Sequence, residues 1–357
     1  MHRDHLGDAP IPADVAPFAA EAVTTRTFDA QEFRGITFHE VRARSILSRV
    51  PGASRMPFEW TANPYQGCTH ACVYCFARGT HGRMDLDTGR GFDSQILVKT
   101  NAPEVLARQL ASARWEGAHI AVGTNVDCYQ RAEERYRLMP GILTALRDRA
   151  NPFSILTKGT LVLRDLELLV QASRVTEVGI SVSIGFTDRD LWRTVEPGAP
   201  SPQLRLDVVR ALGEHGIACG VLMAPVVPFL GDRPEQLRAT VRAIAEAGAS
   251  SVTPLVLHLR PGAREWFTAW LRNHHPDLVP QYEQMYAEGA YAPIRYQRRI
   301  TRQVHDLAAE FGIGPGRRSD AHRISLPEPP SRAAAAERLG PPRRPLPPFR
   351  RSSDRSI

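Results

Sequence analysis

Short apolar stretches alternate with longer amphipathic ones across residues 57–258 of this chain. The apolar stretches are rich in Val and Ile and are hydrophobic at successive positions, which is typical of strands buried on both faces. In the longer stretches apolar residues recur every three or four positions, which predicts helices. The predicted elements are strand 118–123 and helix 132–149, strand 153–156 and helix 162–173, strand 178–184 and helix 202–215, strand 217–227 and helix 234–247, and strand 251–257.

Start and stop signals agree with the predicted helices. Pro202 and Pro234 stand where two helices should begin, and proline is favoured in the first helical turn. Gly216 and Gly248 stand where helices should end, because glycine readily adopts the left-handed conformation that follows a helix. The pattern therefore predicts repeated β–α units, which build a parallel sheet.

The repeat predicts a fold of the α/β class. One more strand before Gly67 brings the number to about six, which favours a partial (β/α)6 TIM-like barrel over a closed barrel of eight strands. Functional side chains are then expected at the C-terminal ends of the strands. The stretches 265–272, 278–288 and 294–311 have a helical pattern and predict a C-terminal helical extension.

These patterns divide the chain into four predicted parts. Residues 1–40 have early prolines and no clear period, and we expect an N-terminal extension. The barrel core is expected at 41–262 and the helical extension at 263–315. After Pro315 the chain is rich in Pro, Arg and Ala, so a disordered basic tail is expected at 316–357.

The positive charge of the chain is concentrated in that tail. The formal net charge is +7, and the tail, with ten Arg and four acidic residues, contributes +6 of it. The rest of the chain is nearly neutral, so its composition does not indicate a nucleic-acid-binding body. Weak contact with nucleic acid is a hypothesis for the 316–357 tail alone.

Composition also bounds the cellular setting. Hydrophobic residues make up 43% of the chain, which supports a sizeable core and excludes wholesale disorder. Five cysteines, unevenly placed, are too few for a disulfide framework in a chain of 357 residues and favour a reducing compartment. No apolar run approaches the roughly 18 residues of a membrane span. We therefore expect a cytoplasmic protein with no membrane partner.

Three of the five cysteines lie close together in the sequence. Cys68, Cys72 and Cys75 have the spacing C-x3-C-x2-C. A compact loop can direct three thiolates to one centre, and thiolates bind zinc and iron–sulfur clusters. A closed zinc site needs a fourth ligand, but Cys128 and Cys219 each stand alone in the sequence. Three ligands for four irons would instead leave one iron open to a small molecule.

The cysteine motif, with an aromatic residue before its last cysteine, resembles the signature of radical S-adenosylmethionine (radical SAM) enzymes. The stretches NPYQGC (63–68), GTNVDCYQ (123–130) and MAPVVP (223–228) are similar to the branch around spore photoproduct lyase, also described as DNA-repair-photolyase-like. HLRPG (258–262) and GAYAP (289–293) resemble an actinobacterial subgroup with no assigned substrate.

This resemblance implies a cofactor pair and a reaction. In the family, three cysteines hold a [4Fe-4S] cluster, and the fourth iron is chelated by the methionine moiety of S-adenosylmethionine. Reductive cleavage of that cofactor gives a 5′-deoxyadenosyl radical, which abstracts hydrogen from a substrate. Here the substrate is unidentified, with nucleic acids or nucleotides as candidates. An electron donor such as ferredoxin or flavodoxin is the implied partner.

The resemblance also assigns roles to residues near the cofactor. Tyr74, between two ligand cysteines, is expected to contact the adenine. Asn125 and Asp127 follow the strand after which the family binds the amino group of the cofactor, and Asp127 is the best acceptor for an ammonium group. For Asp127, capping the helix from Ala132 is the alternative.

Two further strand ends carry candidate contacts. Lys158 follows strand 153–156, and a cation near a helix N-terminus is disfavoured by the helix dipole, which favours a carboxylate or substrate contact. Ser183 is expected to bond ribose or carboxylate, with a bond to the backbone as the alternative. Glu196 and Arg205 are expected either to pair with each other or to reach the ligand.

Cys128 is the candidate catalytic residue, because it follows a strand on the expected active face and would return a hydrogen atom to a product radical. Spore photoproduct lyases use a cysteine donor in this region and a tyrosine after the last cluster cysteine. Phe76 occupies the latter place here, and Cys128 does not clearly match the donor, so thymine-dimer repair is not expected. Arg78 and His81 are expected to support the cluster loop.

An alternative from another class is a non-catalytic iron–sulfur or zinc protein. It would sense redox state through the three cysteines and contact nucleic acid through the basic tail. The β–α repeat and the missing fourth ligand argue against it.

Overall fold

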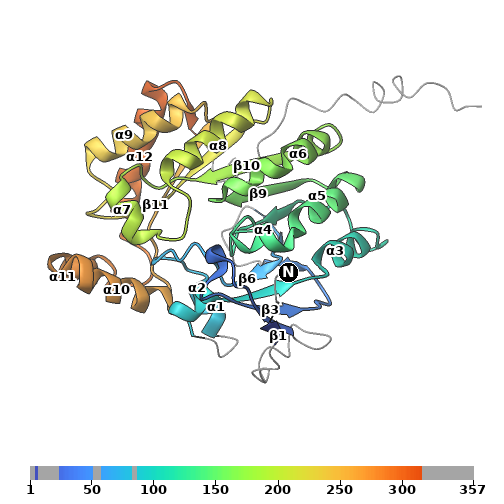
Figure 1. The fold of residues 1–357 in the computed structure, drawn as a ribbon. Helices are drawn as coiled ribbons and strands as arrows, with labels where there is room; N and C mark the ends of the chain where they lie inside the picture. The colour runs from blue at the N-terminus through green and yellow to red at the C-terminus, as the bar shows by residue number, and fades with distance from the viewer. Residues whose placement is uncertain (1–4, 7–23, 51–57, 83–86, 316–357) are drawn as a thin grey trace, which may run out of the picture. The chain divides into compact units, whose positions relative to one another are not determined.

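The computed structural model describes residues 5–6, 24–50, 58–82 and 87–315, and Figure 1 shows how they fold. These residues belong to one compact unit. The tail predicted at 316–357 lies outside the described residues. Within the described part, no helix has the length and apolar character that crossing a membrane requires.

The main sheet has eight strands in the order β13-β12-β11-β10-β9-β8-β5-β4. Neighbouring strands from β5 to β13 are parallel, whereas β4 runs antiparallel to β5. Among the described strands, the pairings end at β4 and β13. The strands are β4 Leu47–Arg49, β5 Trp60–Ala62, β8 Ile120–Val122, β9 Phe153–Thr157, β10 Val178–Ser183, β11 Cys219–Val226, β12 Ser251–Val256 and β13 Gly314–Pro315.

Helices connect the parallel strands, as the alternating pattern predicts (Figure 1). The α/β class, the parallel sheet and the C-terminal helices are therefore confirmed. The helices after β8 are α4 Ala132–Tyr136, α5 Leu138–Asp148, α6 Leu166–Ser173, α7 Arg189–Val195, α8 Pro202–Glu214, α9 Pro234–Glu246, α10 Ala263–His274, α11 Val279–Met285 and α12 Ile294–Glu310.

Some predicted helix boundaries were wrong. The single helix expected at 132–149 is two helices, because Arg137 takes a left-handed backbone conformation with φ of 48° between α4 and α5. The helix expected from residue 162 begins as the 3-10 helix Thr160–Asp165. The stretch expected at 278–288 is helical over Val279–Met285, after the 3-10 turn Pro276–Leu278.

A second sheet carries the segment that leads into the cysteine loop. Its order is β1-β2-β3-β7-β6, and β6 (Tyr65–Gln66) ends directly before Gly67. The other strands are β1 His5–Leu6, β2 Thr24–Thr27, β3 Thr37–Val41 and β7 Gln95–Lys99, and three short helices precede or follow β7, namely α1 Arg78–Gly82, α2 Arg90–Ser94 and α3 Ala102–Leu110. The division into extension, core and helical part stays a prediction, and β3 spans its boundary at residue 40.

The parallel strands are buried between other elements, and this packing holds their ends in place. All six residues of β10 and all three of β8 are buried, as expected for strands covered on both faces. α9 buries Leu237, Val241 and Ile244 on one side, which matches its helical period. Packing of this kind holds the C-terminal ends of the parallel strands at one edge, where α/β proteins carry their functional side chains.

Candidate active site

The cysteine loop joins β6 to α1 and is held by its own backbone. Cys68 and Cys72 are buried, and Cys75 is half-buried. The amide of Cys68 donates to the Phe92 carbonyl at 3.0 Å, and the amide of Cys75 donates to the Cys72 carbonyl at 3.2 Å. The three thiols are free and belong to one tight turn, as their spacing predicts.

The chemistry of the three thiols fits an iron–sulfur cluster. Burial raises the pKa of Cys72 to about 12, and it also raises the pKa of Cys68 and of Cys75. Neighbouring cysteines add to the rise at Cys68 and at Cys72. Buried thiols of this kind bind metal by exchanging their protons for it. Among the described residues, no three His, Cys, Asp or Glu side chains are grouped to hold a single ion. A cluster makes no such demand, because each thiolate binds a different iron.

Arg78 anchors the cysteine loop from inside the protein. Its side chain is fully buried, and its Nε and one terminal nitrogen donate to the Cys72 carbonyl at 3.3 and 3.1 Å. The guanidinium also donates to the Gly89 carbonyl at 2.6 Å and pairs with Asp93 at 2.7 Å. It lies over the Trp266 ring at 4.9 Å. The predicted supporting role of Arg78 thus has a definite geometry.

Gln130 and Gly198 hold the loop from two other sides. The Gln130 side chain accepts from the Thr69 amide and donates to the Gly67 carbonyl, both at 2.9 Å. Gly198 donates its amide to the His70 carbonyl at 3.0 Å, and a Cβ at this position would lie 2.1 Å from the Thr69 carbonyl. The close backbone contact therefore requires glycine. The sequence analysis assigned no such role to either residue, although Gln130 ends the motif GTNVDCYQ (123–130).

A buried charged network lies beside the loop and joins several predicted residues. The Tyr74 hydroxyl and the Arg205 guanidinium both donate to the carboxylate of Glu196, which is fully buried. Lys158 Nζ lies 3.9 Å from Glu196 Oε1 and 5.8 Å from the centre of the Tyr74 ring. Burial alone would raise the pKa of Glu196, but Arg205 and Lys158 outweigh it and lower the pKa. Glu196 is thus a buried carboxylate held in its charged form.

Arg205 extends this network to the end of β10. It donates to the Ser183 carbonyl at 3.0 Å, and the Ser183 hydroxyl donates to the Ala224 carbonyl at 2.9 Å. The backbone bond that was the alternative for Ser183 is therefore present. Of the two alternatives for Glu196 and Arg205, their mutual pairing is present as well.

Asp127 connects the ends of β8 and β9. Its carboxylate accepts from the Tyr129 amide at 2.9 Å, from the Thr157 hydroxyl at 2.6 Å and from the Lys158 amide at 2.6 Å. His70 Nδ1 lies 3.4 Å from the same carboxylate. The alternative of a helix cap does not hold, because the N-terminal residue before α4 is Arg131. A carboxylate has about four lone-pair sites, and the three donors take three of them.

Asn125 and Cys128 stand on either side of Asp127 in different surroundings. Asn125 is half-buried, and no side-chain bond to another described residue is present. Cys128 is fully buried, and a Cβ on Gly123 would lie 3.0 Å from its Sγ. Burial first, and then the charges of Asp127 and Glu133, raise its pKa. The role predicted for Cys128 stays a prediction.

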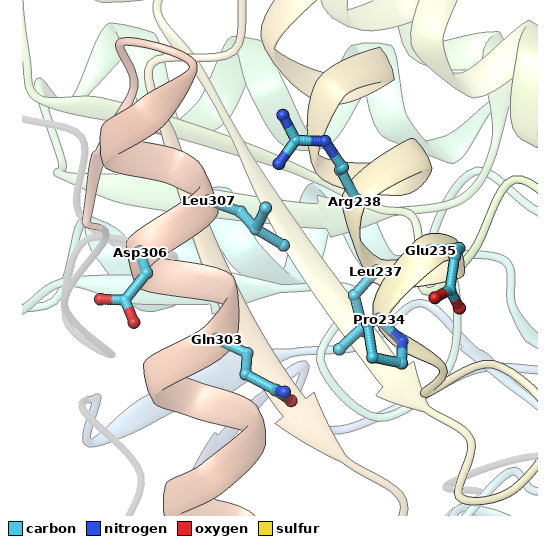
Figure 2. Close-up of a pocket in the computed structure, with 7 residues that line it drawn as sticks. All are labelled: Pro234, Glu235, Leu237, Arg238, Gln303, Asp306 and Leu307. Carbon is cyan, nitrogen blue, oxygen red and sulfur yellow. The ribbon is translucent and has the colours of Figure 1, made fainter.

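A groove between α9 and α12 lies outside this site (Figure 2). None of the residues that line it belongs to the cysteine loop or to the network around Glu196. They are Pro234, Glu235, Leu237, Arg238, Gln303, Asp306 and Leu307.

Comparison with known proteins gives concordant results. A sequence model of the Radical SAM superfamily matches residues 62–252. An uncharacterized protein of Mycobacterium tuberculosis (strain ATCC 25618 / H37Rv) is 45% identical over 303 residues, which are 85% of this chain and 88% of the relative. An uncharacterized protein of Methanocaldococcus jannaschii is 31% identical over 195 residues, which are 54% of this chain and 69% of the relative.

Solved structures of spore photoproduct lyase are similar in fold. A complex with dinucleoside spore photoproduct has a TM-score of 0.62 at 16% identity, over 80% of this chain and 84% of the other. A mutant with bound AdoMet and dinucleoside spore photoproduct has a TM-score of 0.58 at 15% identity, over 74% of this chain and 77% of the other. At this level of identity the likeness concerns the fold alone.

Proposed function

Because this chain belongs to the radical SAM superfamily, whose members use a [4Fe-4S] cluster and S-adenosylmethionine, we propose that Cys68, Cys72 and Cys75 are the cluster ligands. The observation that carries the proposal is the loop of three cysteines beside the strand ends that hold Asp127 and Lys158. When bound, the cluster supplies one electron for reductive cleavage of the cofactor to a 5′-deoxyadenosyl radical.

The residues around the loop bind and orient the cofactor in this proposal. Asp127, already oriented by Thr157 and by the Lys158 amide, accepts from the amino group of the methionine end, with Asn125 beside it. Lys158 meets the carboxylate of the cofactor, while Glu196 and Arg205 hold Tyr74 in place for the adenine. Ser183 contributes to the ribose side, and burial of Tyr74, Glu196 and Arg205 keeps water from this part of the site.

The decisive experiment is anaerobic reconstitution followed by dithionite and S-adenosylmethionine. We expect about four irons and four sulfides per chain, as a [4Fe-4S] cluster requires, and release of methionine and 5′-deoxyadenosine. Cys72→Ala should lose both cluster and cleavage. Cys219→Ala is the matched control, since Cys219 is a buried cysteine in β11 outside the loop, and it should retain both.

Two results would contradict the proposal. Intact cluster with no cleavage of the cofactor would remove the enzymatic function. One zinc per chain and no sulfide would favour the non-catalytic alternative. A one-electron donor of the ferredoxin or flavodoxin kind completes the proposal, since dithionite only replaces it in the assay.

We keep Cys128 as the proposed hydrogen donor, and solvent isotope tests it. A thiol exchanges its hydrogen with the solvent, so deuterium from D2O should appear in the product formed by the wild type. Cys128→Ala should remove that deuterium. An undeuterated wild-type product would exclude the thiol as donor.

The substrate itself is best sought by comparing metabolite and nucleoside extracts of strains with and without the gene.

The basic tail is proposed to contact nucleic acid weakly. Its ten arginines predict DNA affinity that falls with salt and that is lost from a chain ending at Pro315. Affinity that is unchanged in the shortened chain would exclude this role.

A further inference from the structure

Two sequence motifs that the proposed reaction does not use lie side by side. The Leu259 amide donates to the Ala290 carbonyl at 2.8 Å, and His258 pairs with Tyr291 as an antiparallel bridge. Their rings stack, with centres 5.6 Å apart and planes at 26°. The segments 258–262 and 289–293 thus form one structural unit between β12 and α12.

This unit contacts the cysteine loop. Phe76 follows Cys75 directly, and its ring centre lies 5.6 Å from that of His258. The Arg260 guanidinium lies 5.5 Å above the Phe76 ring and donates to the Tyr291 hydroxyl at 3.2 Å. Cys75 is also the least buried of the three cysteines. A continuous row of rings therefore leads from the cluster loop to Tyr291.

The outer end of this row is apolar and exposed. Tyr291 is 55% exposed and Ile294, the first residue of α12, is 62% exposed. Single exposed apolar residues are ordinary on protein surfaces, but two that stand together mark a candidate contact surface. The other large exposed hydrophobic residues of the described part are Val175, in the turn after α6, and Leu204 on α8.

Arginines surround this apolar pair. Arg260, Arg295 and Arg298 are exposed, and none of them pairs with a carboxylate within the part of the chain that the structure describes. Like charges one turn apart on a helix repel, so an acidic partner would relieve Arg295 and Arg298. By contrast, Arg299 is neutralised by Asp232 at 3.5 Å.

The orientation of α12 places Arg295 and Arg298 toward solvent. The helix buries Ile300, Val304 and Ala308 in the core. Figure 2 shows that Gln303 and Leu307, on another side, line the groove toward α9. Helical geometry places Arg295 and Arg298 on the remaining, outward side.

We propose that Arg260, Tyr291, Ile294, Arg295 and Arg298, here called the Tyr291 surface, dock the acidic one-electron carrier that reduces the cluster. An apolar centre with arginines around it has the composition of a protein–protein interface. Contact with the cluster loop through Phe76 keeps the electron path short. One electron leaves the reduced carrier and enters the cluster, and no bond forms or breaks. The inference rests on the proposed function.

The test compares two reductants in the reconstituted full-length protein. The variant Arg295→Glu/Arg298→Glu reverses two charges of the Tyr291 surface. Arg174→Glu/Arg210→Glu is the matched control, since both arginines are exposed and lie at other helices. 5′-Deoxyadenosine is measured with dithionite and with reduced flavodoxin, an acidic carrier. Binding of labelled flavodoxin is followed by fluorescence anisotropy.

We expect the charge-reversed variant to raise the KM for flavodoxin and to weaken its binding by about tenfold or more, with dithionite-driven cleavage unchanged. The control variant should behave as the wild type. The difference in flavodoxin affinity between the wild type and the charge-reversed variant should shrink as the salt concentration rises from about 50 mM to about 500 mM, because exposed charges are screened. Ile294→Ser should weaken flavodoxin binding without this salt dependence.

Three outcomes would overturn the docking proposal. Failure of the proposed function is a different result, because the wild type would then not cleave S-adenosylmethionine even with dithionite. Unchanged flavodoxin binding in the charge-reversed variant is the first. Loss of the dithionite-driven reaction in that variant would assign the surface to substrate or cofactor instead. Loss of binding to a labelled oligonucleotide, with flavodoxin binding retained, would make it a nucleic-acid surface.

Discussion

At the scale of single residues, two buried cations in this protein differ in whether other groups compensate their charge. Arg78 is fully buried, but carbonyl oxygens, Asp93 and two aromatic rings surround its guanidinium. Lys99 on β7 is also buried, and burial alone accounts for the change in its pKa, which is lowered to about 8. The first cation organises the cysteine loop, whereas the second is an energetic cost to the fold.

Arg78→Lys should disturb the cluster more than the fold. Lysine keeps the charge but lacks the planar fork that binds the Cys72 carbonyl twice. We expect less iron per chain after reconstitution and a changed electron paramagnetic resonance signal of the reduced cluster. Arg90→Lys, at an exposed arginine of α2, is the control. A full iron load with an unchanged signal would show that Arg78 does not position the loop.

Lys99→Met should stabilise the protein at neutral pH. The lysine has a pKa of about 8 when folded and about 10.5 when unfolded, so the unfolded state binds more protons between these values. Its penalty, on the order of a few kcal/mol, is complete below pH 8 and disappears as the pH rises to about 10.5. Urea unfolding of wild type and variant across this range measures the difference. A difference independent of pH would contradict the assignment.

At the scale of elements, the loop between α7 and α8 closes the site. The amide of Val73 donates to the Val195 carbonyl, and Gly198 packs against the cysteine loop without room for a Cβ. Glu196 in this loop receives Arg205 from α8 and lies near Lys158 at the end of β9. One short connection thus joins three elements to the cluster loop.

Breaking the buried Glu196–Arg205 pair should cost stability. Arg205→Met leaves a buried carboxylate without its main partner, which typically costs about 3–5 kcal/mol. The double variant Glu196→Gln/Arg205→Met should recover part of this loss, because no unpaired charge remains. Urea unfolding gives both values. Glu196→Gln alone completes the cycle, and if the loss in the double variant equalled the sum of the losses in the two single variants, the two residues would act independently.

Gly198→Val should weaken cofactor binding through the backbone. A Cβ at this position would meet the Thr69 carbonyl, so the α7–α8 loop must move away from the cysteine loop. We expect the affinity for S-adenosylmethionine, measured by equilibrium binding to the reconstituted protein, to fall by about tenfold or more, which corresponds to about 1.4 kcal/mol. Gly213→Val on α8, where nothing lies within 4 Å of a Cβ, is the control.

At the scale of the whole molecule, the cysteine loop links both sheets. It leaves the second sheet at β6, and it is held by Gln130 after β8 and by the α7–α8 loop of the main sheet. Ordering of this loop by a bound group should therefore stabilise the described unit as a whole.

Cluster removal should accordingly lower the melting temperature. A group that binds only the folded state stabilises it by mass action. We expect anaerobic chelation to lower the Tm of the reconstituted wild type, and no such change in Cys72→Ala, which should carry no cluster. An equal Tm for the loaded and chelated wild type would show that the loop does not link the sheets energetically.

The sequence by itself determined the β–α repeat, the parallel sheet and the cysteine motif. These features depend on local patterns, such as the unbroken apolar strand of β10 and the glycine after α9. The break at Arg137 was not predictable, because its left-handed conformation has no local signal in an arginine. The end of α11 at Met285, before the predicted end at residue 288, was not predictable from the local sequence either.

Only the tertiary structure decided which side chains meet at the site. Glu196 and Tyr74 are far apart in the sequence, and nothing local distinguishes their pairing from a contact with the ligand. Arg78, Gln130 and Gly198 act on backbone groups of the cysteine loop, and such contacts depend on the packing of separate elements. The ligands of the cluster are thus encoded in a short motif. The residues around the cysteine loop come from distant parts of the sequence, and their charges are brought together and buried only when the sheet has formed.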